Sequence, residues 1–297
     1  KPLIFTNNDS GYETAIEFKK NGLNPLILDT RKEPSSDIIT EAKNLGIEIK
    51  YSYVVVAAKG YKKVKSADIA KISDNKKDLS NIENIECDCI CVSGFWTPSI
   101  HLASQSGNKS EFNEKIDAFI PKKSKQKENT IGSANGKFTL EETINEAFNK
   151  GYEVSNKITE NNNKVSIPTV VEKKSTKHDK FWCVPLPKGK SYKRFLDFQN
   201  DVAVSDIELA LREGFRSIEH VKRYTTLGMA TDQGKTSNLN GLQLVSDIEN
   251  KVVPQVGHTT FRPPYTPVSI GAIVGREVGK HSKPTRKSPM HWWHEKN

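Results

Sequence analysis

Residues 193–245 read KRFLDFQNDVAVSDIELALREGFRSIEHVKRYTTLGMATDQGKTSNLNGLQLV and carry the clearest local signals in the 297-residue chain. Ser205 and Glu208 have the spacing of a capping box, in which a hydroxyl and a carboxylate accept hydrogen bonds from the first amides of a helix. Gly214 supplies a left-handed residue that ends this helix after Glu213. The stretch therefore predicts a capped helix inside a small helical module.

The same stretch continues with a second helix over 217–228 and a third that begins near Asn238 or Asn240. The loop between them contains GKTS, the end of a phosphate-binding P-loop, but five residues separate Gly228 from Gly234 where that motif needs four. A helix also precedes this loop, whereas a P-loop follows a strand. We therefore expect no nucleoside-triphosphate site here, and a module that docks on something larger.

The first half of the chain alternates apolar strands with helical patterns, which is the order of a dinucleotide-binding unit. Expected strands cover 2–6, 25–29, 47–58 and 85–94, and expected helices cover 12–20 and 38–45. The polar residues 62–84 suit a hairpin with a loose loop. Strands that read as continuous apolar runs belong to a parallel sheet covered on both faces. The sequence thus predicts an α/β domain.

The first turn has lost most of the glycine pattern G-x-G-x-x-G, whose positions fall on Thr6, Asn8 and Gly11. Side chains at the first two positions hinder the close approach of a pyrophosphate. Asp29 ends the second strand, where a carboxylate of this fold accepts hydrogen bonds from ribose hydroxyls. Two interpretations of the turn stay open: a nucleotide site, or a structural βαβ unit, which the missing glycines favour.

Cysteines alternate in the last expected strand, at Cys87, Cys89 and Cys91. Alternate residues of a strand share a face, but the spacing lacks the Cys-x-x-Cys pattern of zinc sites, so we expect buried thiols and no metal. The HWWHE sequence at 291–295 has two histidines without a third ligand and predicts no zinc site either. The loop at 93–98 follows the carboxyl end of this strand, where open α/β sheets bind ligands.

A further candidate lies at 131–139, where a glycine-containing strand end leads into a helix. Thr139 and Glu142 form another capping box, and Gly151 is expected to end the helix. The bare amides and the positive dipole of such a helix start attract an anion. His101 has no evident partner and is expected to be structural.

Charge and composition bear on the class of partner. The net charge of +9 agrees with nucleic-acid binding, but few aromatic residues accompany the lysines to stack bases. The lysines gather at 59–65, 122–127, 172–180 and 188–194. Solvated lysine-rich surface is the favoured interpretation, with no nucleic-acid partner. The sequence has no apolar run long enough to span a bilayer, and its four cysteines do not form a secreted disulfide framework, which points to a cytoplasmic protein.

The segments DFQND, EGFRSIEHVKRYTTLGM and DQGKTSN resemble the small helical domain in the alpha subunit of heterotetrameric sarcosine oxidase. In related amine-oxidising dehydrogenases this domain holds a two-iron, two-sulfur cluster on four cysteines. The matching positions are Asp197, Gln199, Asp232 and Ser237, and none is a thiol, so no cluster can be held by thiolates. This substitution resembles the sarcosine oxidase branch. SGFWTPSIHLASQSG and TTFRPPYTPVSIGAIVG resemble the same subunit.

The resemblance implies cofactors and partners. NAD is expected on the 131–139 segment, where Ser133 replaces an aspartate that disulfide reductases place on the ribityl chain of their flavin. FMN is expected beside the helical module and shared with the beta subunit, while FAD, tetrahydrofolate and the gamma and delta subunits belong elsewhere in the complex. The cofactor residues implied are Gly132, Ser133, Ala134, Asn135, Phe138, Thr139, Lys222, Arg223, Thr225, Thr226 and Lys235. No catalytic residue is expected in this chain.

We therefore expect an incomplete three-layer α/β dinucleotide-binding domain of the disulfide-reductase type, followed by a small all-α domain. The expected divisions are a partial domain at 1–155, a linker at 156–180, the helical domain at 181–250, and an arm at 251–297 that leads to an absent folate-binding aminomethyltransferase domain. The complex would oxidatively demethylate sarcosine to glycine, pass the one-carbon unit to tetrahydrofolate and form hydrogen peroxide. The chain lacks the first glycine-rich unit, so we expect it alone to bind NAD weakly and to be inactive. The alternatives are a basic nucleic-acid-binding protein and a free-standing pyridine-nucleotide-dependent flavoprotein reductase.

Overall fold

A parallel sheet of four strands organises the first part of the chain in the computed structural model, which describes residues 1–124, 126–159, 166–170, 178–275, 277, 279 and 285–297. The strand order is β3-β2-β1-β7. The strands are β1 (Pro2–Thr6), β2 (Leu26–Asp29), β3 (Glu48–Tyr51) and β7 (Cys89–Ser93). All of the pairings between them are parallel, so their carboxyl ends meet at one edge.

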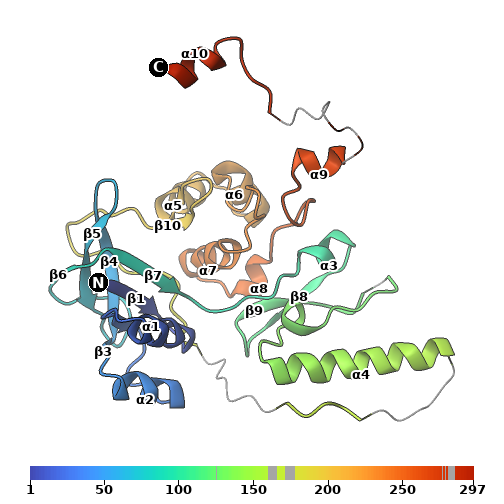
Figure 1. Cartoon of the computed structure of the whole chain (residues 1–297), viewed down its shortest axis with the longest axis horizontal. Coiled ribbons are helices and arrows are strands. Elements are labelled where there is room, and N and C mark those ends of the chain that lie inside the picture. The colour runs from blue at the N-terminus through green and yellow to red at the C-terminus, as the bar shows by residue number, and fades with distance from the viewer. Residues whose placement is uncertain (125, 160–165, 171–177, 276, 278, 280–284) are drawn as a thin grey trace.

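Each face of this sheet is covered by a different layer. Helices α1 (Ser10–Lys20) and α2 (Asp37–Asn44) pack on one face through a core that includes Tyr12, Ile16 and Ile39. An antiparallel sheet packs on the other face, and the apolar side chains between the two sheets form a second core. Its strands are β4 (Tyr53–Gly60), β5 (Val64–Lys71) and β6 (Glu83–Glu86). The prediction of a three-layer α/β domain is confirmed, and Figure 1 shows the layers at the N-terminal end of the chain.

Two expected strands are in fact each divided between the two sheets. Ser52 has a left-handed backbone, with φ 56°, and separates β3 from β4 within the expected strand 47–58. The expected strand 85–94 divides into the end of β6 and the whole of β7, with the buried Cys87 between them. The continuous apolar run was therefore wrongly interpreted as one strand, because successive strands of two packed sheets have the same hydrophobic composition.

After β7 the chain forms α3 (His101–Gln105), the hairpin β8 (Ser110–Asn113) and β9 (Ala118–Pro121), the short 3-10 helix η1 (Gly132–Asn135) and α4 (Leu140–Thr159). The predicted capping box of α4 is confirmed, because the Glu142 amide donates to Thr139 Oγ1 at 3.2 Å and the Thr139 amide to Glu142 Oε2 at 3.4 Å. The predicted end of α4 at Gly151 is wrong. A Cβ built on Gly151 meets nothing within 4 Å, so the helix passes through this residue without obstruction.

The helical module follows, with a small two-stranded sheet at its start. The module contains β10 (Phe195–Asp197), β11 (Val202–Ala203), α5 (Val204–Arg212), α6 (Ile218–Thr225), α7 (Asn238–Glu249) and α8 (Val253–Val256). Its core has Ile207 from α5, Val221 from α6 and Val245 from α7, all nearly inaccessible to solvent. In Figure 1 these helices lie beside the parallel sheet, on the side to which the arrow of β7 points.

Two predicted helix ends in the module need correction. Helix α5 begins at Val204, and the carboxylate that accepts the Ala203 amide is Asp206, at 2.8 Å, so Ser205 and Glu208 do not form its capping box. Helix α6 ends at Thr225, before the predicted end at Gly228, and Thr226 takes the left-handed conformation that closes it. The predicted left-handed Gly214 and the start of α7 at Asn238 are confirmed.

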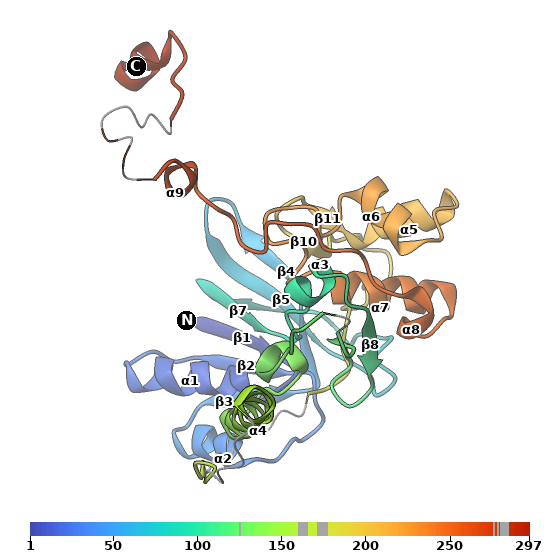
Figure 2. The same cartoon turned by 90° about the vertical axis from the view of Figure 1, so that its right-hand side faces the viewer.

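The last part of the chain is extended, as the prolines predicted, with short helical turns. Pro263 and Pro264 are joined by a cis peptide bond, and α9 (Ile270–Val274) and α10 (His291–Lys296) follow. Figure 2 shows α9 and α10 leading away from the rest of the molecule. The expected linker 156–180 begins inside α4, and its residues 160–165 and 171–177 lie outside the described part. The expected domain divisions therefore stay a prediction.

Candidate functional site

A cleft lies where the parallel strands end and the helical module begins. Thr6, Asn7 and Ser93 line it on the sheet side, and Lys235 and Leu239 line it on the module side. The volume of this cleft is about 810 Å³. Small-molecule sites typically occupy roughly 300–1,000 Å³, so the cleft has room for a cofactor. Because open α/β sheets bind ligands at this edge, the cleft is the candidate functional site.

Aromatic side chains gather where the chain leaves β7 and enters the module. The ring of Phe95 stacks on His178 with a centroid distance of 4.0 Å, and Trp182 meets Phe95 edge-on at 5.2 Å. Trp96 is 66% exposed and Phe198 is 79% exposed, and both line the cleft. Such rings gain stability by stacking on another flat ring, so they offer surface to a flavin or a nucleotide base.

Cationic side chains lie in the same cleft. Arg194 is held in place because its guanidinium donates to the Val184 carbonyl at 3.2 Å and to the Cys183 sulfur at 3.2 Å. Lys193 and Lys235 are the other cations that line the space. Guanidinium and ammonium groups bind phosphate through charge-assisted hydrogen bonds. The cleft therefore combines flat apolar surface with positive charge, which suits a phosphorylated aromatic ligand.

Lys235 joins the cleft to the extended arm. Its ammonium donates to the backbone carbonyl of Tyr265 and lies 4.3 Å from the centroid of the Tyr265 ring. The cation is thus positioned by a carbonyl and an aromatic face, neither of which neutralises its charge. A ligand that carries negative charge can therefore still be attracted by Lys235.

The first turn of the sheet is closed by its own side chains. Asn8 Nδ2 donates to the Gly94 carbonyl, and Asn8 Oδ1 accepts hydrogen bonds from the Ser10 amide at 2.9 Å and the Ser10 hydroxyl at 2.7 Å. A Cβ built on Gly11 lies 2.7 Å from Thr6 Cβ, so this glycine permits close packing of helix on strand. Of the two interpretations left open, these contacts support the structural βαβ unit.

Asp29 has no accessible oxygen for a ribose. Its side chain is fully buried, accepts the Tyr12 hydroxyl at 2.7 Å and is paired with the Arg31 guanidinium at 2.8 Å. Arg31 also binds Asp9 at 2.7 Å, which closes the network. Burial, followed by the charge of Asp29, raises the pKa of Tyr12, so its hydroxyl stays protonated and donating. The expectation that Asp29 accepts ribose hydroxyls is therefore wrong: its oxygens bind side chains of this chain.

The cofactor residues expected on the module do not all lie together. Lys235 lines the cleft, but Lys222 is buried elsewhere and donates to the Thr260 carbonyl at 2.9 Å. Burial lowers the pKa of Lys222. The hydroxyls of Thr225 and Thr226 bind backbone carbonyls of Val221 and Thr225. Arg223 is exposed and, like these three residues, is not part of the cleft lining.

The expected NAD residues lie together on η1 and the start of α4, away from the cleft lining. They are Gly132, Ser133, Ala134, Asn135, Phe138 and Thr139. Glu146 of α4 accepts the Gly132 amide at 2.7 Å and the Asn135 side-chain amide at 2.7 Å. A carboxylate of this chain therefore occupies the donors that were expected to face an anion.

Of the four positions that match cluster cysteines in related domains, Asp197, Gln199 and Ser237 are linked by hydrogen bonds. Asp197 Oδ2 accepts the Gly228 amide at 2.9 Å and the Ser237 hydroxyl at 3.5 Å, and its Oδ1 accepts the Gln199 amide at 2.9 Å. Asp232 accepts the Gly234 amide at 3.1 Å. These bonds hold the loop 228–237 against β10. Within the described part of the chain, no group of three His, Cys, Asp or Glu side chains is arranged to hold a metal ion.

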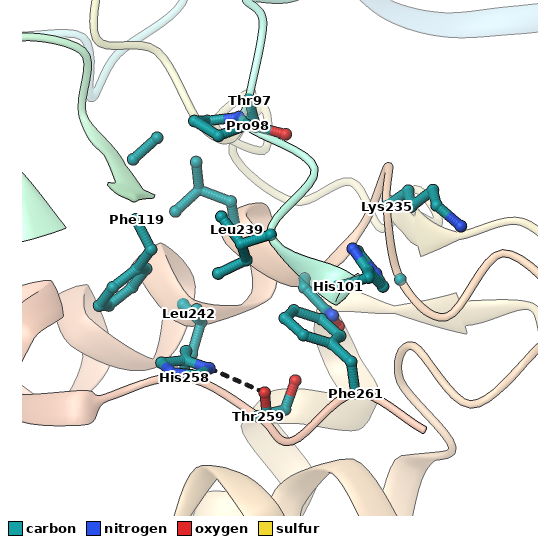
Figure 3. A pocket seen from close by; sticks show the side chains of 14 residues that line it. Thr97, Pro98, His101, Phe119, Lys235, Leu239, Leu242, His258, Thr259 and Phe261 are labelled. Carbon is teal, nitrogen blue, oxygen red and sulfur yellow. Dashed lines mark hydrogen bonds between the residues drawn. The ribbon is translucent and has the colours of Figure 1, made fainter. Parts of the chain in front are cut away.

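His101 connects the chain after β7 to the module, in a second and smaller pocket shown in Figure 3. Its ring is 3% exposed, lies 3.8 Å from the Phe261 centroid, and shares a hydrogen bond of 2.9 Å between Nε2 and the Gln233 carbonyl. Burial lowers the pKa of His101 and keeps the imidazole neutral. The partner of His101 is a backbone carbonyl that the sequence did not indicate, and its structural role stays a prediction.

Several cleft residues carry no sequence signal of their own. The loop at 93–98 was expected to face a ligand because it follows a strand end, and it does line the cleft. Trp182, Arg194 and Phe198 were missed, because they come from segments distant in sequence that the fold brings to the sheet edge. The basic pair beside aromatic residues at 193–198 could have indicated Arg194 and Phe198, whereas no such pattern marks Trp182.

Comparison with known proteins agrees with the class of protein that this architecture defines. L-proline dehydrogenase from P. horikoshii has a similar fold, with a TM-score of 0.50 and 19% sequence identity over 92% of this chain and 50% of that one. The structure thus belongs to the class of α/β proteins with a dinucleotide-binding fold and a small helical part. None of the described helices is long and apolar enough to cross a membrane.

Sequence relatives narrow this class. The chain is 34% identical over 298 residues to sarcosine oxidase subunit alpha of Rhizobium meliloti (strain 1021) and 31% identical over 310 residues to that of Corynebacterium sp. (strain U-96). Residues 191–276 match the sarcosine oxidase A3 domain. The matches cover 100% and 99% of this chain but only 29% and 31% of the relatives. The resemblance to part of a sarcosine oxidase alpha subunit is therefore confirmed.

Proposed function

We propose that the chain acts as part of the alpha subunit of a sarcosine oxidase complex, an oxidoreductase that demethylates sarcosine to glycine. The similarity over its whole length to sarcosine oxidase alpha subunits carries this proposal. The chain spans 29–31% of the length of those relatives, so the activity belongs to the larger assembly. We further propose that a beta subunit oxidises the amine, with gamma and delta subunits present, and that tetrahydrofolate accepts the one-carbon unit outside this chain, in the cytoplasm.

The role of this chain in that assembly is to hold one side of a flavin site. The residues of the cleft fit FMN, because Trp96 and Phe198 offer exposed rings and Lys193 and Lys235 offer positive charge. A bound flavin would supply the transfer of electrons to oxygen. Lys235, which Tyr265 positions, would attract the phosphate, while the aromatic residues would exclude water from one side of the ring. The open side of the cleft is the place for the beta subunit.

NAD is proposed as a second, weaker ligand on the segment 132–139. In the present arrangement Glu146 binds the Gly132 amide, and its negative charge opposes a pyrophosphate at that amide. NAD binding there therefore requires Glu146 to turn away. This contact supports the expectation that the chain alone binds NAD weakly. FAD is placed elsewhere in the complex.

The flavin content of the assembled complex tests the assignment of Lys235. A Lys235→Ala variant is expected to lose roughly 1.5–3 kcal/mol of phosphate binding, which corresponds to about tenfold or more weaker FMN retention. Lys251→Ala is the matched control, because Lys251 pairs with Glu249 on the surface and lies outside the cleft. Equal flavin content in both variants would remove Lys235 from the site. Tight flavin binding by the chain without a beta subunit would instead favour a free-standing reductase.

A further inference from the structure

The cysteines of β7 form a pair that the flavin cleft does not use. Their sulfur atoms, Sγ of Cys89 and Sγ of Cys91, lie 3.7 Å apart, within the distance of an S–H···S hydrogen bond. They share the face of β7 that looks toward α1, since Cys91 packs against the core around Tyr12 while Ile90 packs against the opposite core. The expectation that these thiols are buried is wrong for Cys89, which is exposed.

We propose that Cys89 and Cys91 form a reversible dithiol–disulfide site that is oxidised by hydroperoxides. Residues two apart on a strand have Cα atoms separated by roughly 6.6 Å. Disulfides span Cα distances of roughly 4.4–6.8 Å but Cβ distances of only roughly 3.5–4.5 Å, so the bond closes when the backbone at Cys89, the first residue of β7, moves toward Cys91. A bond near the wide end of that range is strained and is readily reduced again.

The position of the two residues assigns them different roles. β7 is the last strand in the order of its sheet, and Cys89 lies at its first, exposed position. Hydroperoxide reaches this sulfur from solvent. Burial, followed by the hydrogen bond with Cys89, raises the pKa of Cys91 to about 11, so Cys91 keeps its proton and can donate it to the Cys89 sulfur. The exposed Cys89 is therefore the sulfur that meets the hydroperoxide, and Cys91 is the resolving thiol.

The proposed reaction has two steps. The Cys89 sulfur attacks one oxygen of the hydroperoxide and gives it two electrons, so an S–O bond forms and the O–O bond breaks; the other oxygen takes up the proton that Cys89 loses and leaves as an alcohol or water. The Cys91 sulfur then attacks the sulfenic acid of Cys89; the S–S bond forms, the S–O bond breaks, and the oxygen leaves as water with the Cys91 proton. Two thiols and one hydroperoxide thus give a disulfide, an alcohol or water, and water.

Hydrogen peroxide applied to the reduced full chain, followed by mass spectrometry of the intact protein and its peptides, tests the pair. The chain has four free cysteines, at Cys87, Cys89, Cys91 and Cys183. The expected result is the loss of two thiols and of two hydrogen atoms in mass, with fragment ions that link Cys89 to Cys91. A phosphine reductant is expected to restore both thiols.

Serine variants separate this reaction from other oxidation. Cys89→Ser should slow the loss of thiols roughly tenfold, because the exposed nucleophile is gone, and Cys91→Ser should leave Cys89 to oxidise to the sulfinic acid. Cys183→Ser, which changes a cysteine outside the sheet, should form the disulfide at the unchanged rate. Sulfinic acid on the unmodified chain without a disulfide, a disulfide to Cys87 or Cys183, or unreacted thiols would each overturn the proposal. Cys89 and Cys91 are not part of the cleft lining, so the results for these two variants do not depend on the flavin site.

Discussion

Replacing Asp197 with alanine should destabilise the helical module by about 3 kcal/mol. The Asp197 carboxylate is 3% exposed and binds the amides of Gln199 and Gly228, each at 2.9 Å. Removing it leaves the buried Gly228 amide without this acceptor, which costs about 1–3 kcal/mol, and a hydrogen bond to a charged acceptor contributes about 1.5–3 kcal/mol. The Ser237 contact at 3.5 Å is long and adds little. The two costs partly describe the same lost hydrogen bond, so the expected total of about 3 kcal/mol lies near the lower end of their summed range.

Urea unfolding of the full chain at neutral pH measures this loss. The midpoint of the transition should fall, while its slope stays unchanged because the same surface is exposed on unfolding. Asp197→Asn keeps one acceptor oxygen and should lose about half as much. Asp74→Ala is the surface control, since Asp74 is 81% exposed and forms a solvent-facing ion pair with Lys32, and it should change stability by less than about 0.5 kcal/mol.

A loss below about 1 kcal/mol in Asp197→Ala would refute the reasoning, because it would show that the Gly228 amide finds another partner at little cost. An equal loss in Asp197→Ala and Asp74→Ala would refute it as well. The loop 228–237 would then be held by its packing rather than by the carboxylate.

Two further predictions concern packing and pH. Gly11→Ala should cost about 1–3 kcal/mol, because the new Cβ would lie 2.7 Å from Thr6 Cβ, whereas Gly151→Ala in open space within α4 should stabilise the chain by about 0.5–1 kcal/mol; thermal unfolding that gives both changes the same sign would contradict this. Burial lowers the pKa of His101 below its usual 6.5, so the unfolded chain binds more protons near and below that pH and stability should fall as the pH drops from about 7 to 5. His101→Gln retains a donor for the Gln233 carbonyl and should weaken this dependence in melting curves; an unchanged pH slope would count against it.

Local sequence patterns correctly predicted features whose interacting residues are close together in the sequence. The capping box of Thr139 and Glu142 forms because its atoms belong to one helical turn. Ser205 and Glu208 have the same spacing, but the start of α5 is set by the pairing of β11 with β10, which brings Asp206 to the Ala203 amide instead. Sequence spacing cannot rank two such candidates when a tertiary contact decides between them.

The site was predicted less completely than the fold. Lys235 lines the cleft, whereas Lys222 is buried and donates to the Thr260 carbonyl of the arm; the role of either in binding a flavin stays a prediction. The Gly132 amide donates to the carboxylate of Glu146, which lies in the second turn of α4. The aromatic residues at 181–182 reach the cleft only because the chain returns to the sheet edge, where the Asp179 amide donates to the Asn7 carbonyl at 2.9 Å. These contacts link segments far apart in sequence, so no local pattern indicates them.

The most direct test of the account is an electron-density map of the chain assembled with its beta subunit and cofactors. The account predicts a flavin in the cleft at the carboxyl ends of β1 and β7, with its ring beside Trp96 or Phe198 and its phosphate within reach of Lys235. A flavin held elsewhere, with the cleft filled by side chains of the partner, would contradict it.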